Sequence, residues 1–68
     1  MKNTLKVERA KENMTQAELA EKVRVSRQTI NSIEIGKYVP STLLSLKIAS
    51  VFKIGVDEIF TLEDKDWS

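Results

Sequence analysis

The apolar positions of this 68-residue chain recur mostly at the spacing of an α-helix. Leu19, Ala20 and Val23 form one buried edge at spacings i, i+1 and i+4, and Ile30 and Ile33 form another at spacing i+3. The same periodicity extends to both sides of these segments. The pattern predicts an all-α fold, one compact domain of five helices over residues 4–12, 15–23, 27–34, about 42–53 and 56–60.

Capping residues define where these helices begin and end. Thr15 and Glu18 fit a capping box, in which each side chain bonds the other residue's backbone N–H. Ser26 is suited to cap the helix at 27–34, and Ser41 or Thr42 to cap the next one. Gly36 suits the left-handed position that closes a helix. The segment 15–35 is therefore predicted to be two short helices joined by a tight turn at 24–25.

The helix at 42–53 is apolar on two sides, which one small core does not require. One stripe contains Leu46, Ala49 and Phe52, and the other contains Leu44, Ile48 and Val51. A helix that is apolar on two sides is buried on two sides. Because a chain this short buries little core alone, we expect a second copy to cover the second stripe. The predicted homodimer surface contains Leu44, Ile48, Val51 and Trp67.

Charge is distributed unevenly along the chain. Residues 1–53 hold ten Lys and Arg against five Asp and Glu, a net charge of +5, and residues 54–68 have a net charge of −4. A basic body favours an anionic partner; the alternative is a solvated face with a solubilising tail. Residues 61–68 are predicted to be a disordered acidic tail. Trp67 is either frayed with it or packed on helix 56–60 or a partner.

The composition excludes most enzyme chemistry. Without Cys or His the chain forms no disulfide, no usual zinc site and no Ser/His/Asp triad. It has no glycine-rich phosphate loop, and its tail acids lack the spacing of a calcium loop. We therefore predict no enzyme activity, no cofactor and no metal. No apolar segment fits a signal peptide or a membrane span, so the predicted location is cytoplasmic.

Several local sequences together resemble the helix-turn-helix of the Cro/CI/XRE family of DNA-binding proteins. They are Thr15-Gln16, Ser26-Arg27-Gln28-Thr29-Ile30, Gly36-Lys37, Pro40-Ser41 and Val56-Asp57-Glu58-Ile59-Phe60. The resemblance covers about residues 5–60 and is strongest to short single-domain repressors of the cytolysin repressor type. It implies a lambda-repressor-like domain at 1–60, with the helix-turn-helix core at 15–35 and the acidic tail at 61–68. Arg24 stands where the family usually has glycine, and a left-handed Arg costs roughly 1 kcal/mol.

The resemblance also implies a role for each polar residue of the motif. Four residues fall at or beside the positions that read base edges: Arg27, Gln28, Ser32 and Thr29. Arg pairs bidentately with guanine and Gln with adenine, so the chemistry agrees. Four others fall where the DNA backbone is contacted: Gln16, Asn31, Lys37 and Tyr38. Arg9 and Glu34 match a structural ion pair of the family. The alternatives are solvated side chains, a helix-end charge for Lys37 and packing on the domain for Tyr38.

The function that the resemblance implies is sequence-specific regulation of transcription. We expect a repressor that binds double-stranded DNA through the major groove, as a homodimer on a palindromic operator. One recognition helix contacts roughly 4–5 base pairs, and a two-fold dimer doubles that readout, with half-sites ~34 Å apart. The alternative is an antitoxin-like or accessory module whose surface holds a protein partner.

Overall fold

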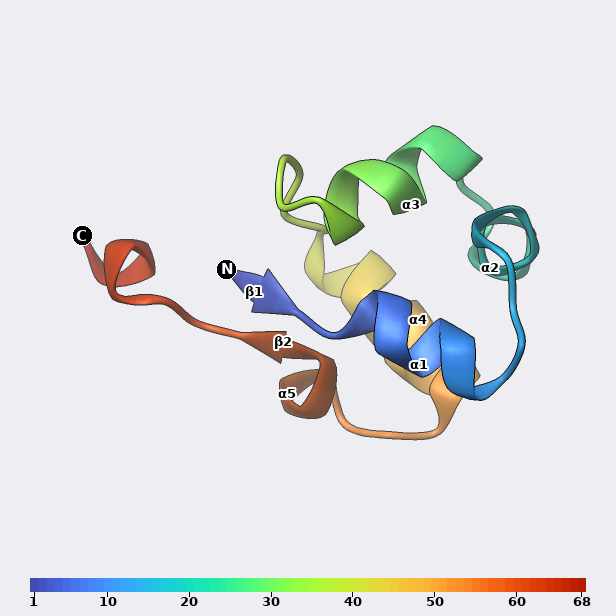
Figure 1. Cartoon of the computed structure of the whole chain (residues 1–68). Coiled ribbons are helices and arrows are strands. Elements are labelled where there is room, and N and C mark those ends of the chain that lie inside the picture. The colour runs from blue at the N-terminus through green and yellow to red at the C-terminus, as the bar shows by residue number, and fades with distance from the viewer.

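A computed structural model describes all residues, 1–68, and shows helices wrapped around a single core (Figure 1). In chain order the elements are β1 (Lys2–Asn3), α1 (Leu5–Lys11), α2 (Gln16–Val23), α3 (Arg27–Glu34), α4 (Thr42–Phe52), α5 (Val56–Ile59), β2 (Phe60–Thr61) and the 3₁₀ helix η1 (Asp64–Trp67). The all-α class and the five predicted helices are confirmed. None of these helices has the length and apolarity needed to cross a bilayer.

The predicted caps form as the sequence indicates. Thr15 Oγ1 accepts the Glu18 N–H at 3.0 Å, and the Glu18 carboxylate accepts the Thr15 N–H at 2.8 Å. Ser26 caps α3, and Ser41 rather than Thr42 caps α4. Arg24 has the left-handed backbone that the turn requires, with φ +61°. The polar side chains at these helix starts satisfy N–H groups that no intrahelical carbonyl can reach.

The core contains side chains from every α-helix. Its fully buried members include Leu5 on α1, Leu19 and Val23 on α2, Ile30 and Ile33 on α3, Ile48 on α4 and Ile59 on α5. The members on α2 and α3 are the inner edges that the periodicity predicted. The helices are too short to be stable alone, so this shared burial is what stabilises them.

The structure corrects the expected dimer stripe on α4. Ile48 is completely buried and Leu44 is 7% exposed, so both belong to the core of one subunit. Val51 is half-buried and packs against the same core. The large apolar side chains of α4 that face outward are instead Leu43 and Leu46, at 65% and 55% exposure. Sequence periodicity could not decide between the two stripes, because both contain large apolar residues.

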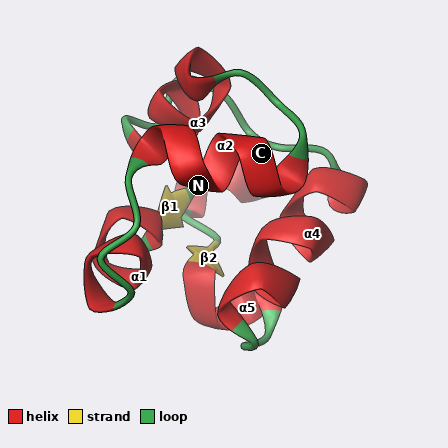
Figure 2. Cartoon of the chain, turned by 90° about the vertical axis from the view of Figure 1, so that its right-hand side faces the viewer, coloured by secondary structure: helices red, strands yellow, loops and turns green.

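The two ends of the domain are paired, which the sequence did not predict. Lys2 and Asn3 lie antiparallel to Thr61 and Phe60, so the predicted helix 56–60 ends one residue early (Figure 1). The tail beyond β2 is not disordered: it forms η1, and Glu63 and Asp66 pair with the amino group of Met1 at 2.9 and 3.0 Å. In the rotated view, β1 and β2 lie between α1 and α5 (Figure 2).

Replacing Ile48 by Ala tests whether α4 faces the core as described. We expect Ile48→Ala to lower the free energy of unfolding by about 2–5 kcal/mol, because it removes buried methyl groups and leaves a cavity. The control is Leu46→Ala, at an exposed position of the same helix, which should cost less than about 1 kcal/mol. Urea titration followed by circular dichroism measures both. Equal losses of unfolding free energy in Ile48→Ala and Leu46→Ala would contradict the burial of Ile48 in the core.

Candidate nucleic-acid interface

The α2–turn–α3 unit is the part of the fold that presents the predicted contact residues. Only Arg24, Val25 and Ser26 separate the two helices. Val25 packs against the core, and Leu19, Val23, Ile30 and Ile33 hold the helices together from inside. Burial of these apolar edges leaves the polar face of α3 directed outward, with Arg27, Gln28 and Asn31 exposed.

The predicted ion pair between Arg9 and Glu34 is present and largely buried. Arg9 Nε donates to Glu34 Oε2 at 2.6 Å, and Arg9 Nη2 donates to Oε1 at 3.0 Å. The side chains are only 13% and 6% exposed. Arg9 Nη1 also donates to the carbonyl of Met14, at 2.8 Å. This bidentate pair therefore connects α1, the start of α2 and the last turn of α3.

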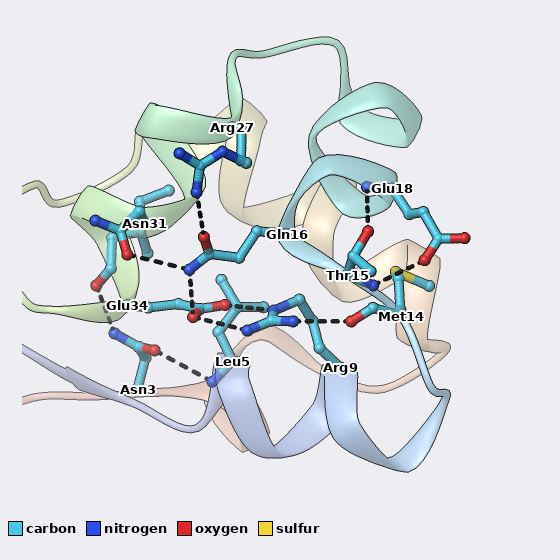
Figure 3. A network of polar contacts seen from close by, with 11 residues as sticks. Asn3, Leu5, Arg9, Met14, Thr15, Gln16, Glu18, Arg27, Asn31 and Glu34 are labelled. Atoms are coloured by element: carbon cyan, nitrogen blue, oxygen red, sulfur yellow. Dashed lines mark hydrogen bonds and ion pairs between the residues drawn. The ribbon is translucent and has the colours of Figure 1, made fainter.

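Gln16 extends this pair into a network that includes residues of the predicted DNA-contacting face of α3 (Figure 3). Its Nε2 donates to Glu34 Oε1 at 3.0 Å and to Asn31 Oδ1 at 3.1 Å. Its Oε1 accepts a hydrogen bond from Arg27 Nη1 at 3.1 Å. Two predicted backbone-contact residues and one predicted base reader thus lie together, at the junction of α2 and α3.

A second group of predicted residues lines an open hollow beside α3. The hollow has a volume of about 480 Å³, and its lining includes Gln28, Thr29, Ser32 and Tyr38. Thr29 Oγ1 and Ser26 Oγ are 2.9 Å apart, so the cap of α3 also restrains Thr29. Lys37 is exposed in the loop after α3, and its backbone N–H donates to the Ser32 carbonyl at 2.9 Å. The predicted contact residues therefore border α3 on two sides.

One supporting residue was missed by the sequence. Asn3 Nδ2 donates to the carbonyl of Ile33 at 2.9 Å, and its Oδ1 accepts the Leu5 N–H at 3.1 Å. It therefore connects β1 to α3. A lone Asn ahead of a helix indicates at most a cap, so no sequence signal could have revealed the contact with Ile33.

The environment of Glu34 keeps its carboxylate charged. Burial alone would raise the pKa of Glu34, but hydrogen bonds from Arg9 and Gln16 outweigh burial and hold the pKa below its ordinary value of 4.5. The same pair raises the pKa of Arg9. Because the folded-state pKa of Glu34 is lowered, the stability it contributes is present above the ordinary carboxyl pKa and is lost as the pH falls through the folded-state value.

Glu34→Gln should therefore lower stability most near neutral pH. We expect a loss of about 1.5–3 kcal/mol there, the range for hydrogen bonds to charged groups. The difference in unfolding free energy between variant and wild type should narrow as the pH falls below about 4.5, where Glu34 of the unfolded chain gains a proton. It should close as the pH passes the lower folded-state pKa. Urea titrations at several pH values measure this difference. The control is Glu12→Gln, because Glu12 is an exposed carboxylate outside any ion pair. If the difference in unfolding free energy between Glu34→Gln and the wild type did not depend on pH, the charged pair of Glu34 with Arg9 would not be its source.

Comparison with known proteins agrees with this geometry. The helix-turn-helix model HTH_3 matches residues 5–59. HTH-type transcriptional regulators, themselves uncharacterized, from Methanocaldococcus jannaschii and Bacillus subtilis are 53% and 46% identical to the chain; each alignment covers 97% of this chain and 100% of the relative.

A solved structure is similar as well. It is the SOS-response transcriptional repressor LexA from Eubacterium rectale, with a TM-score of 0.75 and 31% identity over 79% of this chain and 57% of that one. The chain thus spans just over half of that LexA structure and nearly the whole of its uncharacterized relatives. The family match covers α1 through α5, including Arg9, Gln16, Arg27, Asn31 and Glu34. The chain therefore belongs to the helix-turn-helix family HTH_3, of the Cro/CI/XRE type.

Proposed function

We propose that this protein is a DNA-binding transcriptional regulator that reads a palindromic operator through α3. The observation that carries the proposal is the chemistry of the outward face of α3. Arg27, Gln28 and Asn31 are exposed there, and the one carboxylate of α3, on Glu34, is 6% exposed and neutralised by Arg9. A face rich in donors and free of exposed negative charge suits the acceptor-rich major groove and the flanking phosphates.

The roles within this face follow from side-chain chemistry. Arg27 and Gln28 read base edges, and Ser32 and Thr29 line the hollow beside them, where a thymine methyl or a phosphate fits. Asn31, Lys37 and Tyr38 border the face and contact the DNA backbone with their side chains. Gln16 contacts it through the backbone N–H groups at the start of α2. The basic body of the chain, with a net charge of +5 over residues 1–53, attracts the polyanion at long range.

The operator would be read by two copies of the chain. The candidate contact surface is apolar and lies around the outward side of α4: Leu43 and Leu46 are exposed, and a hollow of about 240 Å³ beside them is lined by Val39, Pro40, Leu46, Val56 and Phe60 among others. Trp67, at 77% exposure, is the most exposed of the large apolar side chains and is also available to a partner. Repression then follows from occupancy, because a dimer bound over a promoter excludes polymerase.

Selection of bound duplexes from a random library tests the DNA-binding role. We expect the wild type to enrich a palindrome with half-sites about ten base pairs apart. Arg27→Ala/Gln28→Ala should weaken operator binding by about a hundredfold or more, since each bidentate contact is worth about 1–3 kcal/mol. Binding to random duplexes should change much less.

Lys11→Ala, which removes an exposed cation of α1, is the control for charge and should keep the motif. If the motif survives the double substitution, α3 is not the reading surface. If the wild type enriches no duplex at all, the regulator proposal fails, and capture of a protein partner becomes the function to examine.

A charge placed on the outward side of α4 tests the dimer. Leu46→Lys should shift the protein toward monomer and weaken operator binding, because it buries an unpaired ammonium in an apolar contact. Val7→Lys is the matched control, since Val7 on α1 is 53% exposed and Leu46 is 55% exposed. Sedimentation equilibrium measures the association. A Leu46→Lys variant that dimerises as tightly as Val7→Lys would show that the contact lies elsewhere.

A further inference from the structure

The hydrogen bonds around Gln16 allow only one orientation of its side-chain amide. A carboxylate accepts hydrogen bonds only, so Glu34 must face the Nε2 of Gln16, 3.0 Å away. A guanidinium donates only, so Arg27 must face the Oε1 of Gln16, 3.1 Å away. Both neighbours therefore require the same amide orientation, and Arg9 keeps Glu34 charged through two further hydrogen bonds.

The orientation of Gln16 in turn determines which hydrogen-bonding groups of Asn31 and Arg27 remain free. Asn31 Oδ1 is occupied as the acceptor of the second Gln16 Nε2 hydrogen bond, at 3.1 Å. Its amide nitrogen has no protein partner, and Arg27 uses only Nη1 within the protein. In Figure 3 the nitrogen of Asn31 and the second terminal nitrogen of Arg27 point away from Gln16. At this end of α3, the nitrogens of Arg27 and Asn31 that remain without a partner in the protein are therefore all donors.

We propose that Glu34, acting through Gln16, is a positioning residue that leaves unpartnered donors of Arg27 turned outward at this end of α3 and so selects guanine. In the major groove guanine presents two acceptors, O6 and N7, whereas adenine presents one acceptor and one donor. Arg27, fixed by Gln16 through one nitrogen, has further N–H groups for a bidentate pair with guanine. The inference rests on the proposed DNA-binding function and adds the base that this position reads.

The same chemistry predicts a switch of specificity. In Arg27→Gln, one N–H of the new amide is taken by Gln16 Oε1, which the rest of the network still presents. The second N–H and the amide oxygen remain, which is one donor and one acceptor. That pair matches N7 and the N6 amino group of adenine. The selected base at this position should therefore change from guanine to adenine, while the rest of the motif stays.

The experiment compares selected motifs and base analogues among matched variants. Glu34→Gln and Gln16→Met should each reduce the preference for guanine at this position about tenfold or more, because both remove the constraint on Arg27. Glu21→Gln removes one exposed carboxylate of α2 and should leave the preference unchanged. Gln16→Met lies outside the core, so it keeps the inference testable if Glu34→Gln unfolds; melting curves establish which variants are folded.

Analogue duplexes separate base reading from a merely structural effect. For the wild type, 7-deazaguanine at the selected position should weaken binding about tenfold, since it lacks N7. Inosine, which keeps O6 and N7, should bind like guanine. For folded Gln16→Met, the penalty of 7-deazaguanine should largely disappear.

The outcomes distinguish this inference from the function on which it rests. If the wild type enriches a palindrome that has no guanine at the position contacted by Arg27, the proposed guanine preference is wrong, but the DNA-binding function stands. An unchanged guanine preference in folded Gln16→Met shows that the network does not position Arg27. A wild type that enriches no duplex overturns both.

Discussion

The buried carboxylate of Glu34 is the constraint around which the polar half of this domain is arranged. A charge that is 6% exposed is tolerable only if its hydrogen-bonding capacity is met within the protein. Arg9 on α1 and Gln16 at the start of α2 meet it, so the last turn of α3 cannot move independently of either helix. An apolar contact at this point would tolerate small shifts and rotations of α3 against α1. The bidentate pair between Arg9 and Glu34 allows only one placement of the two helices.

This placement matters because the apolar core of so short a chain is small. Thirteen of the 68 residues are buried, and each helix contributes only a few of them. The core holds α2 against α3 from inside, and the network holds their outer junction. Together they make a rigid unit from two helices of eight residues each. Rigidity is what a reading surface needs, because side chains placed on fixed helices contact base edges without a large cost in ordering.

The two halves of the proposed reading surface differ in how strongly the fold restrains them. Arg27 and Asn31 are held by Gln16 before any partner arrives, whereas Gln28 and Ser32 border an open hollow in which no side-chain hydrogen bond holds them. The first half is therefore suited to fixed, chemically strict recognition, and the second to adjustment around a methyl group or a phosphate. The apolar surface outside α4 is separate from both, since different residues line it.

Local chemistry in the sequence determined the boundaries of α2 and α3, because caps and left-handed positions act within a few residues: Thr15, Ser26 and Gly36 lie where their chemistry requires. It also determined which residue types face outward on α3, because one helical edge is apolar and the other is not. Only the tertiary structure decided which stripe of α4 enters the core, that β1 and β2 pair, and that Gln16 is bound between Glu34 and Arg27. Each of these features depends on contacts between residues far apart in the chain, and local sequence patterns do not predict such contacts.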